Sequence, residues 1–233
     1  MLPPRFRQSA LAAILLLVSS SMPAQSGDPL QKILAQMDRT AANFHTTQAS
    51  FVWDQYQKVV DETDTQKGVV YFRRNGNEVQ MAADIRVPEP PMYVLFSDDK
   101  VQLYKPKIDQ VEVYNAGKDR AAFESFLVLG FGGSGQEMLK SFDVKYLGSE
   151  KVANLDTAKL ELIPKSQKVR NVFDHIWLWI DPARGVSVQQ QFFSAGGDYR
   201  LAKYSDIRLN EKINDAVFRL KTTGKTKFVS PQG

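Results

Sequence analysis

The chain has 233 residues, no cysteine and a formal net charge of +4 at pH 7. The lack of cysteine excludes disulfide bonds, thiolate metal sites and cysteine nucleophiles. Basic and acidic residues are interspersed rather than gathered in a basic stripe, so the sequence predicts no nucleic-acid partner.

The first 26 residues have the order of a secretory signal peptide. Arg5 and Arg7 precede the apolar run Leu11–Val18, which is too short to span a bilayer, and Ala24–Ser26 fits a cleavage site. We therefore expect export, cleavage near residues 24–26 and a mature chain of about 207 residues. Because this peptide contains no cysteine, no lipid anchor is expected on it. The remainder, 27–233, has a length that fits one domain.

A helix is predicted at the start of the mature chain. Asp28 is a good N-cap, and Pro29 suits the first helical position. Apolar residues then recur at helical spacing: Leu30, Ile33, Leu34, Met37, Ala41 and Phe44. One face of this helix needs a hydrophobic surface to lie on.

Short strands separated by turn residues follow. The first set is Ser50–Val60, Gly68–Arg73, Glu78–Ile85, Met92–Ser97, Val101–Lys105 and Ile108–Tyr114. The second set is Asp143–Gly148, Ala158–Pro164, Phe173–Asp181, Val186–Phe193, Tyr199–Leu209 and Val217–Leu220. This spacing predicts an antiparallel barrel or sandwich. The run Pro88–Pro91 cannot sit inside a sheet and is expected in a loop or at an edge.

A second helical region is predicted between the two sets of strands. Apolar residues at helical spacing form one stripe: Phe123, Phe126, Leu127, Gly130 and Phe131. Ser134 and Glu137 then form a capping box for a short helix that runs to Phe142.

The residues that suggest catalysis are weak signals. Gly130–Gly135 matches GxGxxG, but its surroundings are antiparallel strands rather than a βαβ unit, which favours a glycine hinge over a nucleotide site. Ser134 lacks the G-x-S-x-G frame, and His45 and His175 have no ligand or triad spacing. The sequence therefore predicts no enzyme activity, no metal and no cofactor.

Two predicted strands are apolar on both faces, namely Val69–Phe72 and Ile176–Ile180. A sheet with one solvated face alternates apolar and polar residues. The second face is therefore covered by a helix within a thick core or lines a cavity, and the pattern alone favours neither.

Several short motifs resemble the periplasmic lipoprotein carriers of Gram-negative bacteria (the LolA type). They are Phe44–Phe51, Gly68–Arg74, Ser97–Lys100, Tyr104–Pro106 with Gln110–Val111, Leu162–Lys165 and Asn214–Phe218. Two positions depart from the family pattern, since Asn75 replaces a proline and Thr223–Lys225 replaces Pro-x-Gly. The first departure bears on the assignment of Arg74 as the gating arginine of the family, and the second suggests a distant or lineage-specific member that carries a different lipid.

The resemblance implies a mainly β (α+β) fold, an incomplete antiparallel β-barrel around a hydrophobic cavity with helices as a lid. It implies a soluble, monomeric periplasmic carrier that binds acyl chains of lipoproteins or a related lipid. Such a carrier receives its cargo from an inner-membrane transporter and delivers it to an outer-membrane acceptor. It also implies that Arg74 holds the lid by hydrogen bonds to helix or loop carbonyls. The alternative is an ordinary exposed strand arginine.

The apolar residues predicted to line the cavity are Phe51, Trp53, Tyr71, Phe72, Leu95, Leu103, Phe123, Phe126, Leu127, Phe131, Trp177 and Trp179. The sequence does not decide which strand face points inward, because a register shift of one residue turns every side chain over. A second hypothesis is a periplasmic sensor of the same fold that detects mislocalised lipid and contacts a membrane signalling partner. A secreted enzyme is a third, less favoured one.

Overall fold

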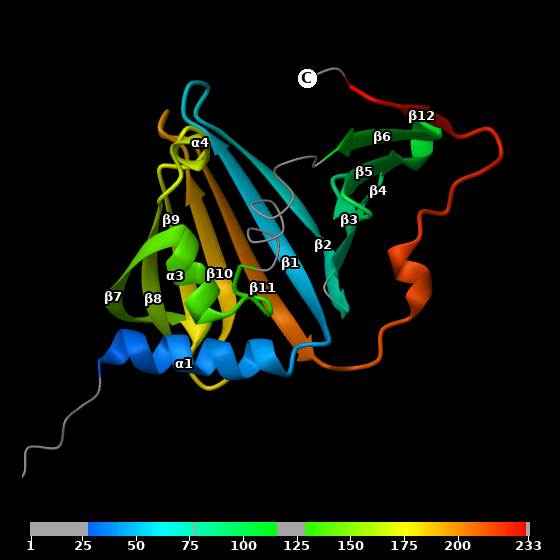
Figure 1. The fold of residues 1–233 in the computed structure, drawn as a ribbon. Helices are drawn as coiled ribbons and strands as arrows, with labels where there is room; N and C mark the ends of the chain where they lie inside the picture. Colours follow the sequence, from blue (N-terminus) through cyan, green and yellow to red (C-terminus); the bar gives the residue numbers. More distant parts are fainter. Residues whose placement is uncertain (1–27, 77, 116–128, 232–233) are drawn as a thin grey trace, which may run out of the picture.

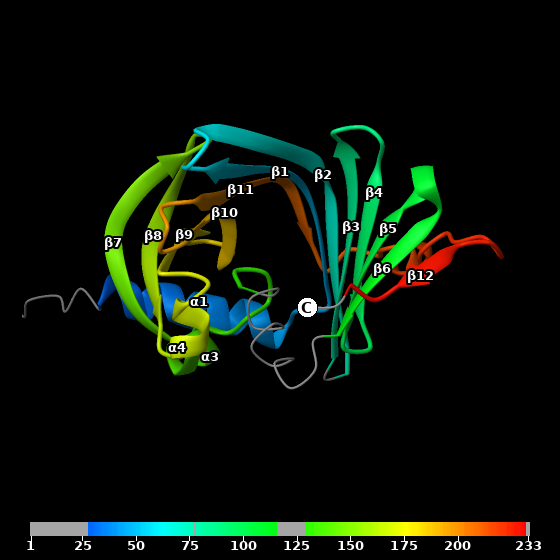
Figure 2. The same cartoon turned by 90° about the horizontal axis from the view of Figure 1, so that it is seen from above.

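The computed structural model describes residues 28–76, 78–115 and 129–231. In this part of the chain, 12 strands form a single curved sheet in the order β12-β6-β5-β4-β3-β2-β1-β11-β10-β9-β8-β7. Figure 2 shows the sheet as an arch, with the helices α1 and α3 on its concave side. We call this concave side the inner face and the opposite side the outer face. The expected signal peptide (1–26) lies outside the described residues.

Helix α1 (Pro29–Ala42) crosses one end of the arch (Figure 1). Its N-cap is the predicted Asp28, whose side chain accepts a hydrogen bond from the backbone N–H of Leu30 at 3.0 Å. The apolar stripe of α1 is buried, namely Ile33, Leu34, Met37 and Ala41. Each of the three larger side chains among these contributes about 1.5–3 kcal/mol by leaving water, so packing on the sheet stabilises the helix. None of the helices in residues 28–76, 78–115 and 129–231 is long and apolar enough to cross a membrane.

The first half of the sheet is a run of antiparallel neighbours. It contains β1 (Thr46–Gln57), β2 (Glu62–Asn75), β3 (Glu78–Val87), β4 (Met92–Ser97), β5 (Lys100–Lys105) and β6 (Gln110–Asn115). The 3₁₀ turn η1 (Pro106–Ile108) joins β5 to β6, as expected from a proline that cannot donate to a ladder. Strand β2 begins at Glu62 rather than at the predicted Gly68, because the polar residues 62–67 also pair with β1, opposite residues 52–57.

The second half follows the short helix α3 (Gly135–Ser141), which Ser134 caps as predicted. It contains β7 (Phe142–Val152), β8 (Leu155–Pro164), β9 (His175–Asp181), β10 (Val186–Phe193) and β11 (Tyr199–Leu209), with the helical turn α4 (Gln167–Arg170) between β8 and β9. Strand β11 pairs with β1 and thereby joins the two halves. The sheet ends at β7 and β12, and the described strands include no pairing between these two. The incomplete antiparallel barrel that the sequence predicts is confirmed.

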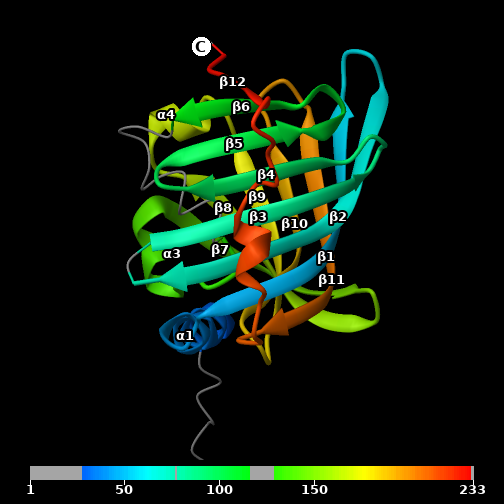
Figure 3. The same ribbon diagram turned by 90° about the vertical axis from the view of Figure 1, so that its right-hand side faces the viewer.

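The chain after β11 crosses the outer face of the first half (Figure 3). We call residues 210–229 the C-terminal strap. It contains the 3₁₀ turn η3 (Asp215–Phe218) and β12 (Lys227–Val229), which pairs in parallel with β6. The strand predicted at Val217–Leu220 is therefore wrong. Asn214 caps a turn there, and Phe218 packs against the outer face of β3 and β4 instead of joining a ladder.

Candidate functional site

The inner face of β1–β3 is an apolar surface, and Phe44 and Phe131 pack on it. One buried cluster joins these strands to the chain after α1 and to the segment before α3: Phe44, Ala49, Phe51, Val70, Phe72, Ile85 and Phe131. Trp53 packs against this cluster while half-buried. Leu103 pairs with Val94, which also packs on the cluster, and directly paired residues share a face. Five predicted residues thus lie on or against the inner face: Phe51, Trp53, Phe72, Leu103 and Phe131. Their role in lipid binding stays a prediction.

Four predicted cavity residues lie on the outer face instead. Tyr71 and Leu95 pack with Ala82 and Phe218 beneath the C-terminal strap. Trp177 and Trp179 alternate with residues of the core cluster next to α1, so their rings point the other way. The ammonium of Lys159 lies 4.0 Å from the Trp177 ring centroid and 4.8 Å from that of Trp179. The sequence placed these four on the wrong face, because an apolar run contains no register information.

Three further predicted residues, Phe123, Phe126 and Leu127, lie outside the described residues. The structure resumes at Leu129, immediately before the glycine-rich motif.

The turn of residues 129–133, here called the glycine segment, approaches the inner face closely. Gly130 and Gly132 have positive φ angles of +80° and +91°, a backbone conformation that residues other than glycine rarely adopt. A Cβ on Gly130 would lie 2.3 Å from Cβ of Ser187, and one on Gly132 would lie 2.5 Å from a ring carbon of Phe44. Both glycines are therefore explained by close packing, of Gly130 against β10 and of Gly132 against Phe44 in the chain after α1.

Three backbone carbonyls of the glycine segment accept hydrogen bonds from the sheet. The Gln190 side-chain amide donates to the carbonyl of Leu129. The backbone N–H of Ser187 donates to the carbonyl of Gly130 at 2.8 Å. The Arg74 guanidinium donates to the carbonyl of Gly132 at 3.1 Å. The segment is fastened to both halves of the sheet through these polar contacts.

Phe131 is the side chain that the glycine segment inserts into the inner face, and it is only 1% exposed. Its ring stacks on Phe72 at 5.4 Å between centroids and meets Tyr204 edge-on at 4.6 Å. The Tyr204 hydroxyl donates to the Gln190 side-chain oxygen at 3.3 Å, and burial raises the pKa of this hydroxyl above its ordinary value. Phe131 thus fills space between the two halves of the arch.

Arg74 lies at the end of β2, beside the chain that leaves α1. Its guanidinium carbon is 5.5 Å from the centroid of the Phe44 ring, and its backbone N–H donates to the carbonyl of His45 at 2.8 Å. The contact with the Gly132 carbonyl is of the kind that we expected for a residue holding a lid. The gating role itself stays a prediction.

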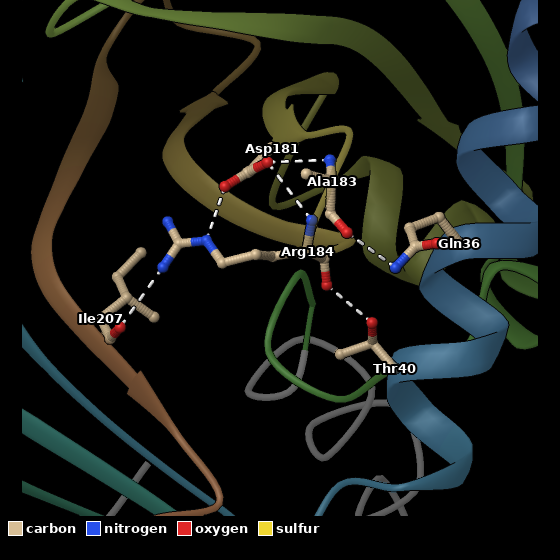
Figure 4. A network of polar contacts seen from close by, with 6 residues as sticks. All are labelled: Gln36, Thr40, Asp181, Ala183, Arg184 and Ile207. Carbon is tan, nitrogen blue, oxygen red and sulfur yellow. Dashed lines mark hydrogen bonds and ion pairs between the residues drawn. The ribbon is translucent and has the colours of Figure 1, made fainter.

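Helix α1 is attached to the turn between β9 and β10 by a separate polar network (Figure 4). Gln36 donates to the carbonyl of Ala183 at 2.9 Å, and Thr40 donates to the carbonyl of Arg184 at 2.6 Å. The buried carboxylate of Asp181 accepts from the Ala183 and Arg184 N–H groups and from the Arg184 guanidinium, at 2.9, 3.3 and 2.6 Å. Asp181 therefore shapes the turn on which the helix rests.

Sequence reasoning missed Ser187, Gln190 and Tyr204. The available signal was the polar run Gln189–Gln191 within a strand flanked by apolar residues, since buried amides need partners. Of the two histidines, His45 is exposed, and Nδ1 of His175 lies 2.8 Å from the carboxylate of the exposed Asp174. The described ranges contain no group of three or more His, Cys, Asp or Glu residues that could hold a metal ion.

No family model matches the sequence, and no curated protein matches it either. Solved structures do match the fold. An uncharacterized conserved protein from Thermus thermophilus is 12% identical and has a TM-score of 0.55, over 87% of this chain and 99% of the other. MucB is 12% identical with a TM-score of 0.53, over 88% of this chain and 66% of MucB. A LolA superfamily protein from Nitrosomonas europaea is 14% identical with a TM-score of 0.41, over 83% of this chain and 99% of the other. At 12% identity, the matches to the Thermus thermophilus protein and to MucB show a likeness of fold alone.

Proposed function

We propose that the protein is a periplasmic carrier that binds acyl chains of lipoproteins, or of a related lipid, on the inner face of its open barrel. It takes this cargo from a donor in the inner membrane to an acceptor in the outer membrane, as a monomer and after loss of residues 1–26. Its work is binding rather than catalysis.

The observation that carries this proposal is the apolar inner face with Phe131 seated in it. An acyl chain in water costs about 0.8 kcal/mol per exposed CH₂, so an aqueous crossing requires an apolar container. The cluster around Phe51 and Phe72 supplies such a surface. In the structure the ring of Phe131 covers part of this surface, through stacking on Phe72. We infer that an entering acyl chain displaces this ring.

A carrier must also release its cargo. The glycine segment is held by three hydrogen bonds to its backbone carbonyls, from Gln190, Ser187 and Arg74. Each bond contributes about 0.5–1.5 kcal/mol net, so the closed form is stabilised modestly rather than irreversibly. The three hydrogen bonds are broken while cargo is bound and form again when it leaves. Their free energy therefore favours release of the cargo to the acceptor.

A sensor is the second candidate, and the match to MucB favours it. MucB forms a complex with MucA in a solved structure that is 11% identical to this chain with a TM-score of 0.50. In that case this protein would bind lipid as a signal and contact a membrane partner. The present chain matches 66% of MucB, so the remainder of MucB has no counterpart in the alignment.

Native mass spectrometry of the protein purified from its own periplasm separates the two candidates. A carrier is expected to arrive partly loaded with diacyl or triacyl species, and to give them up to acceptor membranes. A protein that is empty in repeated preparations, and that takes up no lipoprotein from donor membranes, would overturn the carrier proposal.

Replacing Arg74 with leucine should raise the affinity for acyl cargo and slow its release. The change removes the hydrogen bond to the Gly132 carbonyl and the contact with Phe44, and both stabilise the closed form. The loss of one such bond predicts an affinity increase of about two- to tenfold. Displacement of a fluorescent fatty acid measures the affinity, and transfer to acceptor vesicles measures the release.

Arg73→Leu is the matched control, because the neighbouring arginine points to the outer face. Its guanidinium contacts Asp215 at 2.6 Å and lies 4.2 Å from the Phe218 ring centroid. Acyl affinity should be unchanged in this variant. An Arg74→Leu protein that binds and transfers cargo at wild-type rates would show that Arg74 is an ordinary strand arginine.

A further inference from the structure

A second pocket, of about 430 Å³, lies on the outer face between β2–β5 and the C-terminal strap. It is separate from the inner face, because its walls include the strap and the outward-pointing Tyr71. Ligand pockets measure about 300–1,000 Å³, so this volume suits a small ligand.

The floor of the pocket is low because β3 places alanine between larger neighbours. Ala82 pairs with Tyr71 on one side and with Leu95 on the other. Two residues along β4 from Leu95, and on the same face, Tyr93 pairs with Tyr104, and their rings are roughly parallel with centroids 6.3 Å apart. The result is a depression in the sheet bordered by the faces and edges of aromatic rings.

Polar atoms without a partner converge on this depression. The Asp84 carboxylate receives both bonds from Arg86 on one oxygen, at 2.9 and 2.7 Å, and the described residues offer no partner to its other oxygen. The hydroxyls of Tyr71 and Tyr93 likewise have no hydrogen bond among the described residues. Desolvation, followed by the charge of Asp84, raises the pKa of the Tyr71 hydroxyl, so this group stays a neutral donor.

The strap supplies the opposite wall. Asn214, Arg219 and Lys221 line the pocket from this side, and all three side chains are exposed. Arg86 already neutralises Asp84, so Arg219 and Lys221 of the strap give the pocket a positive net charge. An anionic ligand is therefore favoured over a cationic one.

The strap is fixed in place beyond this wall. Asp109 accepts hydrogen bonds from the hydroxyls of Thr226 and Thr223 at 2.6 and 2.7 Å, and these bonds hold the pKa of its carboxyl below the ordinary value. On the other side of the pocket, Arg73 contacts Asp215. The pocket is thus closed between two attachments rather than formed by a free tail.

We propose that this outer pocket binds an acidic saccharide of one or two rings. The C–H face of a sugar ring packs on tyrosine, whose ring is apolar and whose hydroxyl is polar. Sugar hydroxyls both donate and accept, which matches the mixture of Tyr71, Asp84 and Asn214. The acid group, a carboxylate or a phosphate, pairs with Arg219 and Lys221. This site is independent of acyl binding on the inner face.

The test is a titration of the full-length mature protein followed by backbone amide NMR. Four probes are compared: glucuronic acid, glucose 6-phosphate, glucose and inorganic phosphate. We expect saturable shifts in β3, β4 and the strap with both acidic sugars, and binding at least about tenfold weaker for glucose and for phosphate alone. Equal binding of inorganic phosphate would mean an unspecific anion site and would overturn the proposal, as would the absence of saturable shifts.

Two variants assign the binding to the pocket. Arg219→Gln removes the cation on the exposed strap and should weaken the acidic sugars by about tenfold without loss of stability. Arg208→Gln is the matched control, since Arg208 is also exposed but lies outside the pocket. A control that weakens binding as much as Arg219→Gln would contradict the assignment. Unaltered acyl binding in both variants keeps this test separate from that of the carrier function.

Discussion

Phe131→Ala should both destabilise the empty protein and increase its affinity for acyl chains. The ring is buried between Phe72 and Tyr204, and removing a buried phenylalanine side chain costs about 3–5 kcal/mol. The space it leaves lies on the apolar inner face, where an acyl chain can occupy it without first displacing the ring. Chemical denaturation of delipidated protein measures the loss of stability, and displacement of a fluorescent fatty acid measures the affinity.

Phe193→Ala is the control for this experiment, because Phe193 is a half-buried aromatic residue of the outer face. Its ring stacks on His175 at 4.2 Å between centroids. The variant should lose less stability than Phe131→Ala and keep the wild-type acyl affinity. If Phe131→Ala is destabilised but binds acyl chains no more tightly than the wild type, Phe131 is a permanent part of the core and the displacement model fails.

The elements that sequence patterns predicted well are those with local causes. Asp28, Pro29 and the helical stripe specify α1 without reference to the rest of the chain. The meander β4–β6 follows from turn residues, because Asp98 and Asp99 adopt positive φ angles and Pro106 opens a 3₁₀ turn. Such signals lie within a few residues of the structure that they specify.

The elements that the sequence could not place depend on distant partners. The outward orientation of Trp177 and Trp179 is set by the register of β9 with β8 and β10, and an apolar run contains no signal for that register. The fastening of the glycine segment uses backbone carbonyls, and these have no signature in the sequence. Phe218 lies in a short apolar run that has the pattern of a strand. Its packing against Ala82 and Leu95 depends on the outer face of the sheet, which the local sequence does not specify. Local pattern therefore predicted the wall of the barrel better than the contacts that close it.

Asp181→Ala should lower the free energy of unfolding by about 2–4 kcal/mol, since it removes a buried carboxylate and leaves its donors unsatisfied. The carboxylate accepts three hydrogen bonds within the β9–β10 turn, and the carbonyls of Ala183 and Arg184 in that turn hold α1. The structural consequence should be faster hydrogen exchange in α1. Denaturation and exchange mass spectrometry measure the two effects.

Asp174→Ala provides the comparison, because the side chain of this aspartate is 65% exposed and its carboxylate contacts only His175 among the described residues. Its replacement should change stability by no more than about 0.5 kcal/mol. An Asp181→Ala protein as stable as Asp174→Ala would show that the turn does not depend on the carboxylate. If Asp181→Ala loosens α1 while acyl affinity stays at the wild-type value, and Phe131→Ala changes that affinity, then α1 is a fixed wall of the container. The part that responds to cargo is then the glycine segment, which polar bonds to its backbone hold in place.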